Sequence, residues 1–314
     1  MAEKLQCTQE RAEALVRDFE GKVFLFNLLS MKLIDERNVE LAVRFSDFVH
    51  AQIKDVNLRT LDHLNAKAYY FMGLAYEQAG KLGTLRELLF EGYRSACIRL
   101  DQISQVTILN IILRSYLKEN LVEQAANLIN ISKDAYPENA NNNQVARYLY
   151  YEGRVKAIQL DYSDAQTRLL QALRKAPEVG GKGFRVEAQK LLIIVELLMG
   201  EIPDRYIFSQ PDFRKPLLPY FQIVQSVRAG DLEAFRSALT KYSDVLKKDR
   251  NHTLITRLKH NVIKFGLRKI NASYSQISLE DVCKKLGLET VKDTEFIVAK
   301  VSERARQGRQ SATA

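Results

Sequence analysis

Residues 148–177 read YLYYEGRVKAIQLDYSDAQTRLLQALRKAP. Gly153 and Ala165 are small enough to let two helices approach closely, and Leu169 fills the space that remains between them. Pro177 cannot continue a helix and therefore marks the end of the second one. These residue types at these offsets are typical of the tetratricopeptide repeat, so the stretch predicts two antiparallel helices joined by a short turn.

The same pattern occurs three times, with equivalent positions 40 residues apart. Each hairpin exposes an apolar face that only its neighbours cover, so the hairpins must stack into an extended solenoid. We therefore expect an all-α fold, a tetratricopeptide-like right-handed solenoid that begins near residue 20. Gly80 would end one first helix in a left-handed conformation, and Asn120 stands at the next turn. The columns of the repeat are Gly73, Leu113 and Gly153; Leu85, Ala125 and Ala165; and Leu89, Ile129 and Leu169.

The composition is that of an ordinary globular protein in a reducing compartment. Of 314 residues, 46% are hydrophobic and 27% are charged, and the 14 Gly and 6 Pro are few enough to suit long helices. Cys7, Cys97 and Cys283 lie far apart, which argues against a disulfide framework or a zinc site. The longest apolar run, residues 191–199, contains Glu196 and is too short to cross a membrane, which takes about 20 residues. We therefore expect an intracellular protein without a membrane span.

The character of the chain changes after Gly200. Four of the six prolines lie within residues 203–219, a spacing through which no helix continues. We therefore expect four regions, which are tetratricopeptide-like repeats over residues 1–200, a proline-rich connector over 201–219, C-terminal helices over 220–301 and a disordered tail over 302–314.

The C-terminal region predicts the front half of a winged helix. Residues 253–271 have the period of one long helix, and residues 274–278 (YSQIS) favour a short strand. Ser278 is suited to cap a helix that ends at Gly287, and a last helix is expected over residues 291–301. The buried face of the capped helix would consist of Leu279, Val282 and Leu286.

Together these features resemble the PCI family, whose members are scaffold subunits with a helical stack followed by a winged helix. Within that family the resemblance is greatest to subunits of the proteasome lid. PCI subunits also occur in the COP9 signalosome, in translation initiation factor three and in messenger-RNA export complexes. The stretches that carry the resemblance are NNNQVARYLYYEGRVKAIQLDYSDA (residues 141–165), KLLIIVELLMGEIPDR (190–205), RLKHNVIKFGLRKINASYSQISLEDV (257–282) and DTEFIVAK (293–300).

The resemblance implies a non-catalytic scaffold subunit in the lid of the 26S proteasome regulatory particle, in the cytoplasm and nucleus. Such a subunit supports ubiquitin-dependent protein degradation through contacts with other PCI subunits of the lid, and the family has no catalytic residues. Two alternatives stay open. One is a PCI subunit of the COP9 signalosome or the initiation factor, and the other is an adaptor that binds nucleic acid.

Family members carry two strands, the wing, after the helix that here ends in DTEFIVAK. Residues 301–314 (VSERARQGRQSATA) are small, polar and basic, so they cannot form a buried hairpin. The strand around Ile277 would then lack its partners, although strand addition at this edge pairs subunits within the family. We therefore expect a partial, wing-less winged helix and weakened incorporation into the lid.

A cluster of tyrosines and arginines is a candidate protein interface, because these residue types are enriched at interface hot spots. Tyr150 and Tyr151 are adjacent and cannot both face the repeat core, so one of them would reach solvent or a partner. The same rings are equally suited to the core of the repeat, and the sequence leaves both interpretations open. The candidate residues are Arg147, Tyr148, Tyr151 and Arg154.

Further candidate interface residues lie on the basic helix over residues 253–271 and are Arg257, Lys264 and Arg268. Winged helices often bind DNA through a helix in the major groove. The equivalent helix here, residues 291–301, carries Asp293 and Glu295, whose charges repel the phosphate backbone. We therefore favour protein docking over nucleic-acid binding for these cations, and Ile277 is the candidate for strand pairing with a partner.

The sequence contains no pattern typical of an enzyme. It lacks the Gly-x-Ser-x-Gly elbow and the phosphate-binding Gly-x-x-x-x-Gly-Lys-Ser/Thr loop. It also lacks the His-x-His motif of the metal-dependent protease that shares complexes with PCI subunits. His252 and His260 are too far apart along a helix to form a metal-binding pair. We expect no catalytic residues, no metal, no cofactor and no small-molecule substrate.

Overall fold

The computed structural model describes residues 18–300, apart from residues 55, 57, 133–135, 137–139, 178–179, 275, 289–291 and 293. Throughout this part of the chain the regular secondary structure is helical and no strand is formed, which confirms the predicted all-α class. The chain divides into two compact units, Met1–Val155 and Lys156–Ala314, and the division falls inside helix α8 (Asn142–Ile158).

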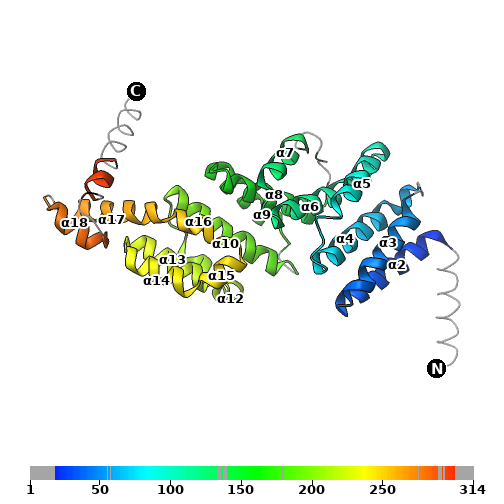
Figure 1. The fold of residues 1–314 in the computed structure, drawn as a ribbon, viewed down its shortest axis with the longest axis horizontal. Coiled ribbons are helices and arrows are strands. Elements are labelled where there is room, and N and C mark those ends of the chain that lie inside the picture. The colour runs from blue at the N-terminus through cyan, green and yellow to red at the C-terminus, as the bar shows by residue number, and fades with distance from the viewer. Residues whose placement is uncertain are drawn as a thin grey trace. The chain divides into compact units, whose positions relative to one another are not determined.

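Unit 1 consists of successive antiparallel helix pairs, as the repeat predicts (Figure 1). Helix α4 packs on both α3 and α6, and α6 packs on both α5 and α7, so each helix pair covers the apolar face of the next. The elements of unit 1 before α8 are α2 (Phe19–Asp35), α3 (Val39–Ile53), the 3-10 helix η1 (Arg59–Leu61), α4 (Asp62–Gln78), α5 (Arg86–Arg99), α6 (Gln102–Lys118) and α7 (Val122–Ser132).

The turns between paired helices repeat with the same 40-residue period as the side chains. Gly80, Asn120, Leu160 and Gly200 all have a left-handed backbone, with φ of 70°, 59°, 75° and 93°. The residue after each one donates its N–H to the carbonyl five positions earlier, at 2.9–3.0 Å, which is the hydrogen bond of a Schellman cap. The predicted role of Gly80 is therefore confirmed, and Leu160 adopts the same conformation without the freedom of glycine.

The side-chain columns of the repeat are buried, as predicted. Leu85, Leu89, Ala125 and Ile129 belong to the main hydrophobic core of unit 1, and Ala165 and Leu169 are fully buried in unit 2. Gly73 is in close contact with helix α6, because a Cβ atom there would stand 3.0 Å from Ile111 Cγ2. The absence of a side chain at this column thus allows α4 and α6 to pack directly.

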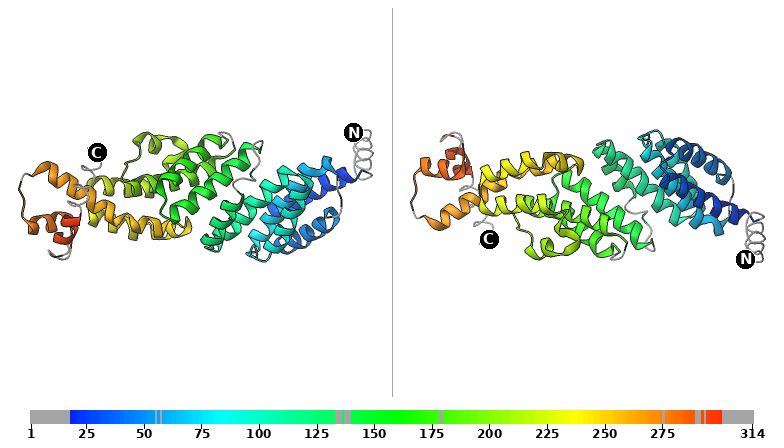
Figure 2. Two further views of the ribbon diagram at one scale, coloured as in Figure 1. Left: turned by 90° about the horizontal axis from the view of Figure 1, so that it is seen from above. Right: turned by 90° about the horizontal axis from the view of Figure 1, so that it is seen from below.

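Unit 2 is a bundle around α10, which packs on α9, α13 and α16 (Figures 1 and 2). The predicted connector, residues 201–219, includes two short helices. The elements of unit 2 after α8 are α9 (Tyr162–Lys175), α10 (Lys182–Met199), α11 (Arg205–Ser209), α12 (Pro211–Arg214), α13 (Leu218–Ala229), α14 (Leu232–Lys241), α15 (Ser243–Lys248), α16 (His252–Arg257), α17 (Lys259–Ser273) and α18 (Leu279–Leu286).

Buried polar groups connect α10 to the helices that follow it. The ammonium of Lys190 lies 2.9 Å from Asp249 Oδ2, and the hydroxyl of Tyr220 donates to the same oxygen at 2.9 Å. Asn261 donates from Nδ2 to the carbonyl oxygens of Leu197 and Leu198 at the end of α10. A buried charge that loses its partner is strongly destabilising, so arrangements of these helices that break the pair are disfavoured. These contacts therefore set how α10, α13 and α17 are arranged within unit 2.

The prediction of a single long helix over residues 253–271 is wrong. The structure has two helices, α16 and α17, separated at Leu258. At this point two backbone hydrogen bonds join residues that are three apart, as in a 3-10 turn. The N–H of Leu258 donates to the carbonyl of Ile255, and the N–H of Asn261 donates to the carbonyl of Leu258. The side chain of Leu258 is fully buried at this break, although the local sequence favours a continuous helix.

The C-terminal helices agree with the prediction only in part. Ser278 accepts a hydrogen bond from the N–H of Asp281, and Gly287 ends α18 with a φ of 63°, as predicted. Leu279 is wrongly predicted as buried, since it lies at the first position of α18 and is 40% exposed. The described residues of the predicted strand, 274 and 276–278, are not in a strand.

Helical backbone continues over residues 294–300, where a last helix was expected. The predicted wing-less end and disordered tail fall on residues 301–314, outside the described residues.

Gly230 and Gly266 mark the closest approach between two helices of unit 2. Gly230 ends α13 with a φ of 72° and lies against the backbone of α17. A Cβ on Gly266 would stand 2.9 Å from the carbonyl oxygen of Gly230 and 2.5 Å from Leu286 Cδ2. Any side chain at Gly266 would therefore push α17 away from both α13 and α18.

We predict that Gly266→Ala lowers the free energy of unfolding by about 1–3 kcal/mol, because one methyl group overfills this contact. The matched control is Gly183→Ala on α10, where no atom lies within 4 Å of the added Cβ. That variant should be neutral or gain up to about 1 kcal/mol from helix propensity. Urea denaturation followed by circular dichroism measures both, and equal stabilities would contradict the packing described.

Candidate functional site

The aromatic candidates on α8 lie in the core of unit 1. Tyr148 and Tyr151 are both buried among the hydrophobic residues of that core. The ring centroid of Tyr148 is 4.3 Å from that of Tyr136, and its hydroxyl is 3.4 Å from Ser132 Oγ. Of the two interpretations that the sequence leaves open for these rings, the structure favours the repeat core.

The arginines of the same helix are only half-buried. The guanidinium of Arg147 stacks 5.2 Å from the ring centroid of Tyr70, and Arg154 donates from Nη1 to the hydroxyl of half-buried Tyr150 at 3.1 Å. Both cations are held in place by tyrosine side chains, Arg147 by a ring and Arg154 by a hydroxyl, while part of each side chain stays accessible. Arg147 and Arg154, with Tyr150, are therefore the accessible part of the predicted α8 cluster.

The basic candidates of α16 and α17 lie in unit 2 and differ in accessibility. Arg257 is exposed and donates to the carbonyl oxygen of Ile158 at 3.4 Å, while Arg268 is exposed with its guanidinium 5.7 Å from the ring of Phe265. Lys264 and Ile277 are half-buried. The α8 candidates and these four residues thus belong to different compact units.

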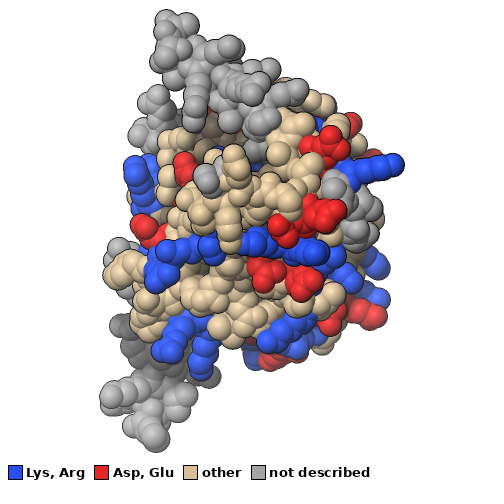
Figure 3. Space-filling model, turned by 90° about the vertical axis from the view of Figure 1, so that its left-hand side faces the viewer, with Lys and Arg blue, Asp and Glu red and all other residues tan. Residues whose placement is uncertain are grey.

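Charge on the end of the molecule shown in Figure 3 is mixed, because carboxylates lie beside and between the Lys and Arg side chains. A duplex-binding face needs a continuous array of cations against the phosphates. Within the helical residues 294–300, Glu295 is exposed and Phe296 is 68% exposed. This pattern argues for a protein surface and against a DNA-reading helix.

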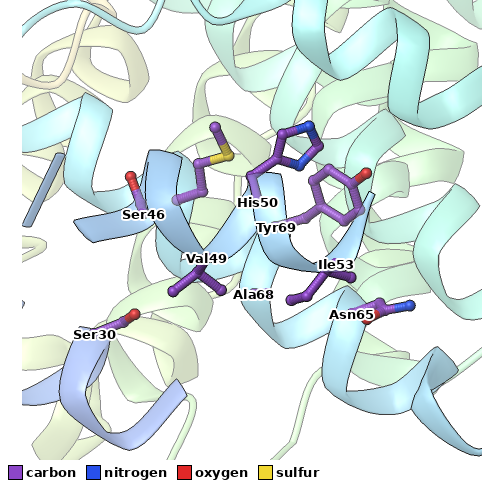
Figure 4. A pocket seen from close by; sticks show the side chains of 9 residues that line it. Ser30, Ser46, Val49, His50, Ile53, Asn65, Ala68 and Tyr69 are labelled. Atoms are coloured by element: carbon purple, nitrogen blue, oxygen red, sulfur yellow. The ribbon is translucent and has the colours of Figure 1, made fainter. Parts of the chain in front are cut away.

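Two small cavities lie beside α3, the first among α2, α3 and α4 and the second among α3, α4, α5 and α6. The first has a volume of about 10 Å³, room for a single water molecule, and its lining includes Ser30, His50 and Asn65 (Figure 4). The second, about 60 Å³, shares His50 and Asn65 and extends to Ser104. Burial, followed by the charge of Lys54, lowers the pKa of His50. These cavities match the size of bound solvent, and within the described residues no cluster of His, Cys, Asp or Glu is arranged to hold a metal ion.

A larger surface groove, with a volume of about 840 Å³, was missed by the sequence analysis. It is formed by the connector together with α11, α12, α13 and one residue of α17. Leu218, Phe221, Gln225 and Arg228 line it from a single face of α13, at steps of three and four residues. That periodicity was the signal available in the sequence, although the four prolines nearby made the region resemble a simple connector.

Family models match almost the whole chain. The model described as "PSMD3-like, N-terminal TPR repeats" matches residues 2–224. The chain belongs to the PSMD3-like family. A PCI domain model matches residues 239–301, so the predicted PCI resemblance is confirmed.

Named relatives of this PSMD3-like chain come from plants, insects and a slime mould. It is 45% identical over 284 residues to "26S proteasome non-ATPase regulatory subunit 3 homolog A" of Arabidopsis thaliana, covering 90% of this chain and 58% of the relative. It is 44% identical over 281 residues to the "Probable 26S proteasome non-ATPase regulatory subunit 3" of Anopheles gambiae, covering 90% and 56%.

A third relative, "26S proteasome non-ATPase regulatory subunit 3" of Dictyostelium discoideum, is 42% identical over 284 residues, covering 90% of this chain and 56% of the relative. The PSMD3-like chain thus spans a little over half the length of these relatives. Among its described residues, no helix is both long and apolar enough for a membrane span.

Glu196 is the one carboxyl group whose pKa is raised to about 7 among the described residues, and burial is the main cause. The nearby charges of Glu201 and Asp204 raise it further. Glu196 lies on α10, and its Oε2 atom is buried with no hydrogen-bond partner in the described part of the chain. The ionised form of this PSMD3-like residue is therefore poorly solvated, and folding favours its protonated form.

We predict that the contribution of Glu196 to the stability of the PSMD3-like chain falls as pH rises from about 4.5 to about 7, because in that window the folded state holds a proton on Glu196 that the unfolded chain has lost. Glu196→Gln removes this dependence. Relative to the unmodified chain, the variant should be equally stable near pH 4.5 and about 1–2 kcal/mol more stable near pH 8, a figure reduced to allow for partial exposure.

Urea denaturation across this pH range measures the difference. The control, Glu123→Gln, replaces an exposed carboxylate in the first turn of α7, where the helix N-terminus favours a negative charge, so this variant should not be more stable than the unmodified chain near pH 8. If the stability difference between Glu196→Gln and the unmodified chain did not change with pH, folding would not disfavour the ionised form of Glu196, which would contradict the prediction.

Proposed function

We propose that this PSMD3-like chain is a non-catalytic scaffold subunit of the 26S proteasome regulatory particle, within its lid. The observation that carries the proposal is the 42–45% identity, over 90% of the chain, to relatives named as non-ATPase regulatory subunit 3 of the 26S proteasome. Because the chain spans only a little over half the length of those relatives, we propose separately that it assembles into the regulatory particle. The chain would act in the cytoplasm and nucleus, where it supports ubiquitin-dependent degradation.

The stacked helices support a scaffold role on physical grounds. A solenoid covers the apolar face of each hairpin with its neighbours and leaves long rows of outward side chains available for partners. Arg147 and Arg154 in unit 1, and Arg257 and Arg268 in unit 2, are accessible cations held by aromatic rings, a tyrosine hydroxyl or a backbone carbonyl. Arginines that are ordered before binding lose less entropy at an interface, so these are the proposed contact residues with other PCI subunits.

The less accessible candidate residues would contribute less to the contacts with partners. Lys264 and Ile277 are half-buried, so each offers only part of its surface to a partner. Tyr148 and Tyr151 would act indirectly, because their rings shape the core on which the α8 arginines rest.

We predict that the tagged chain, expressed in cells, co-purifies with other regulatory-particle subunits of the proteasome. Charge reversal by Arg257→Glu together with Arg268→Glu should reduce their recovery by about tenfold, because like charges oppose an interface evolved for cations. The matched control, Lys247→Glu with Lys248→Glu on exposed positions of α15, should leave recovery unchanged. Quantitative mass spectrometry of the purified material is the measurement.

Failure of the unmodified chain to recover any regulatory-particle subunit would contradict the proposal. Recovery of RNA with RNA-binding proteins instead would favour the adaptor alternative. Circular dichroism of each variant establishes that the reversed charges leave the fold intact.

A further inference from the structure

The groove of unit 2 combines an apolar floor with a cationic rim. Its apolar lining comes from the connector, α11 and α13 and includes Ile202, Phe208, Leu218 and Phe221. Its charged lining consists of Arg205, Arg214, Arg228 and Lys269. We propose that this groove binds an acidic amphipathic helix of a partner protein.

The apolar side chains on the floor of the groove are widely exposed to solvent. Leu218 is 50% exposed and Ile202 is 41% exposed, and the rings of Phe208 and Phe221 contact each other with centroids 5.1 Å apart. Contiguous apolar surface of this kind is typical of a site that is covered by a partner. An α-helix has a diameter of about 10 Å with its side chains, and an apolar stripe along it would cover these residues.

The cations of the rim fix the charge of the occupant. All four are exposed, and none forms an ion pair with any residue that the structure describes. The described lining of the groove contains no Asp or Glu. Of three nearby carboxylates, Asp212 pairs with Lys182 and Glu201 accepts from Gln166, so the four rim cations outnumber the remaining one, exposed Asp204. The local field therefore favours an anionic partner.

Other occupants fit these features less well. Single-stranded nucleic acid binds through aromatic rings that stack on bases, whereas this floor is mostly aliphatic and its two phenylalanines contact each other. A second copy of the chain carries the same formal charge of +9 and would bring cations against cations. A helix with leucines on one face and carboxylates at its edges matches both the floor and the rim.

This inference is independent of the proposed function, because it concerns a site within unit 2 and is tested on the isolated full chain. The probe is a designed, fluorescein-labelled helical peptide with leucines along one face and glutamates at the other positions. Fluorescence anisotropy measures its binding to the chain. The comparison peptide has lysine in place of every glutamate.

We expect the acidic peptide to bind and the lysine peptide to bind at least about tenfold more weakly. Arg228→Glu combined with Lys269→Glu should weaken binding of the acidic peptide by about tenfold or more, and Leu218→Ser should weaken it without altering its dependence on salt. The matched controls are Lys247→Glu with Lys248→Glu, and Val245→Ser, all at exposed positions of α15 outside the groove. These controls should bind as the unmodified chain does.

Three results would overturn the inference. They are a failure of the acidic peptide to bind, equal binding of that peptide by the groove variants and the unmodified chain, and binding of the lysine peptide as tight as that of the acidic one. A labelled oligouridine that binds the chain and is lost in the Arg228→Glu, Lys269→Glu variant would instead assign the groove to nucleic acid. Thermal melts of each variant ensure that lost binding reflects the groove and not unfolding.

Discussion

Close packing between the first helices of neighbouring hairpins is the contact on which unit 1 depends. Gly73 leaves no side chain between α4 and α6, so Ile111 packs directly on the α4 backbone. One repeat later the same column holds Leu113, which is fully buried. Because each apolar face is covered only by the next hairpin, stability depends on contacts between neighbours and the outward faces are left for binding.

Unit 2 uses a different solution for the same problem. After α10 most of its helices are shorter and the repeat period no longer applies, so orientation there comes from specific contacts. Gly230 and Gly266 let α13 and α17 meet through backbone, while Lys190, Tyr220 and Asp249 join α10 to the helices after it. The connector with its short helices is packed beside α13, and the same arrangement that fixes the bundle also creates the groove.

Periodic features of this fold could be predicted from the sequence, and contacts between distant residues could not. The repeat column formed by Leu85, Ala125 and Ala165 is buried as predicted, because the residues on one face of a helix follow directly from their spacing. The break at Leu258 was missed, because the apolar period of residues 253–271 continues through it.

The candidate sites divide in the same way. The residue types of the α8 cluster indicated a candidate protein interface. Only the structure, with Tyr136 packed against Tyr148, distinguishes the buried rings from the accessible arginines. The groove was hidden because Arg214 and Lys269 are far apart in sequence and come together only in the folded unit.

Hydrogen exchange of Gly73→Leu tests the central claim, that covering of one hairpin by the next holds the stack together. A side chain at this column must separate α4 from α6, since even its Cβ would stand 3.0 Å from Ile111. Amide protection is then lost together in α4, α5 and α6 and is kept in α13 and α17, while Gly80→Asn, at a left-handed turn with open space, retains full protection. Unchanged protection of α6 in Gly73→Leu would contradict the account.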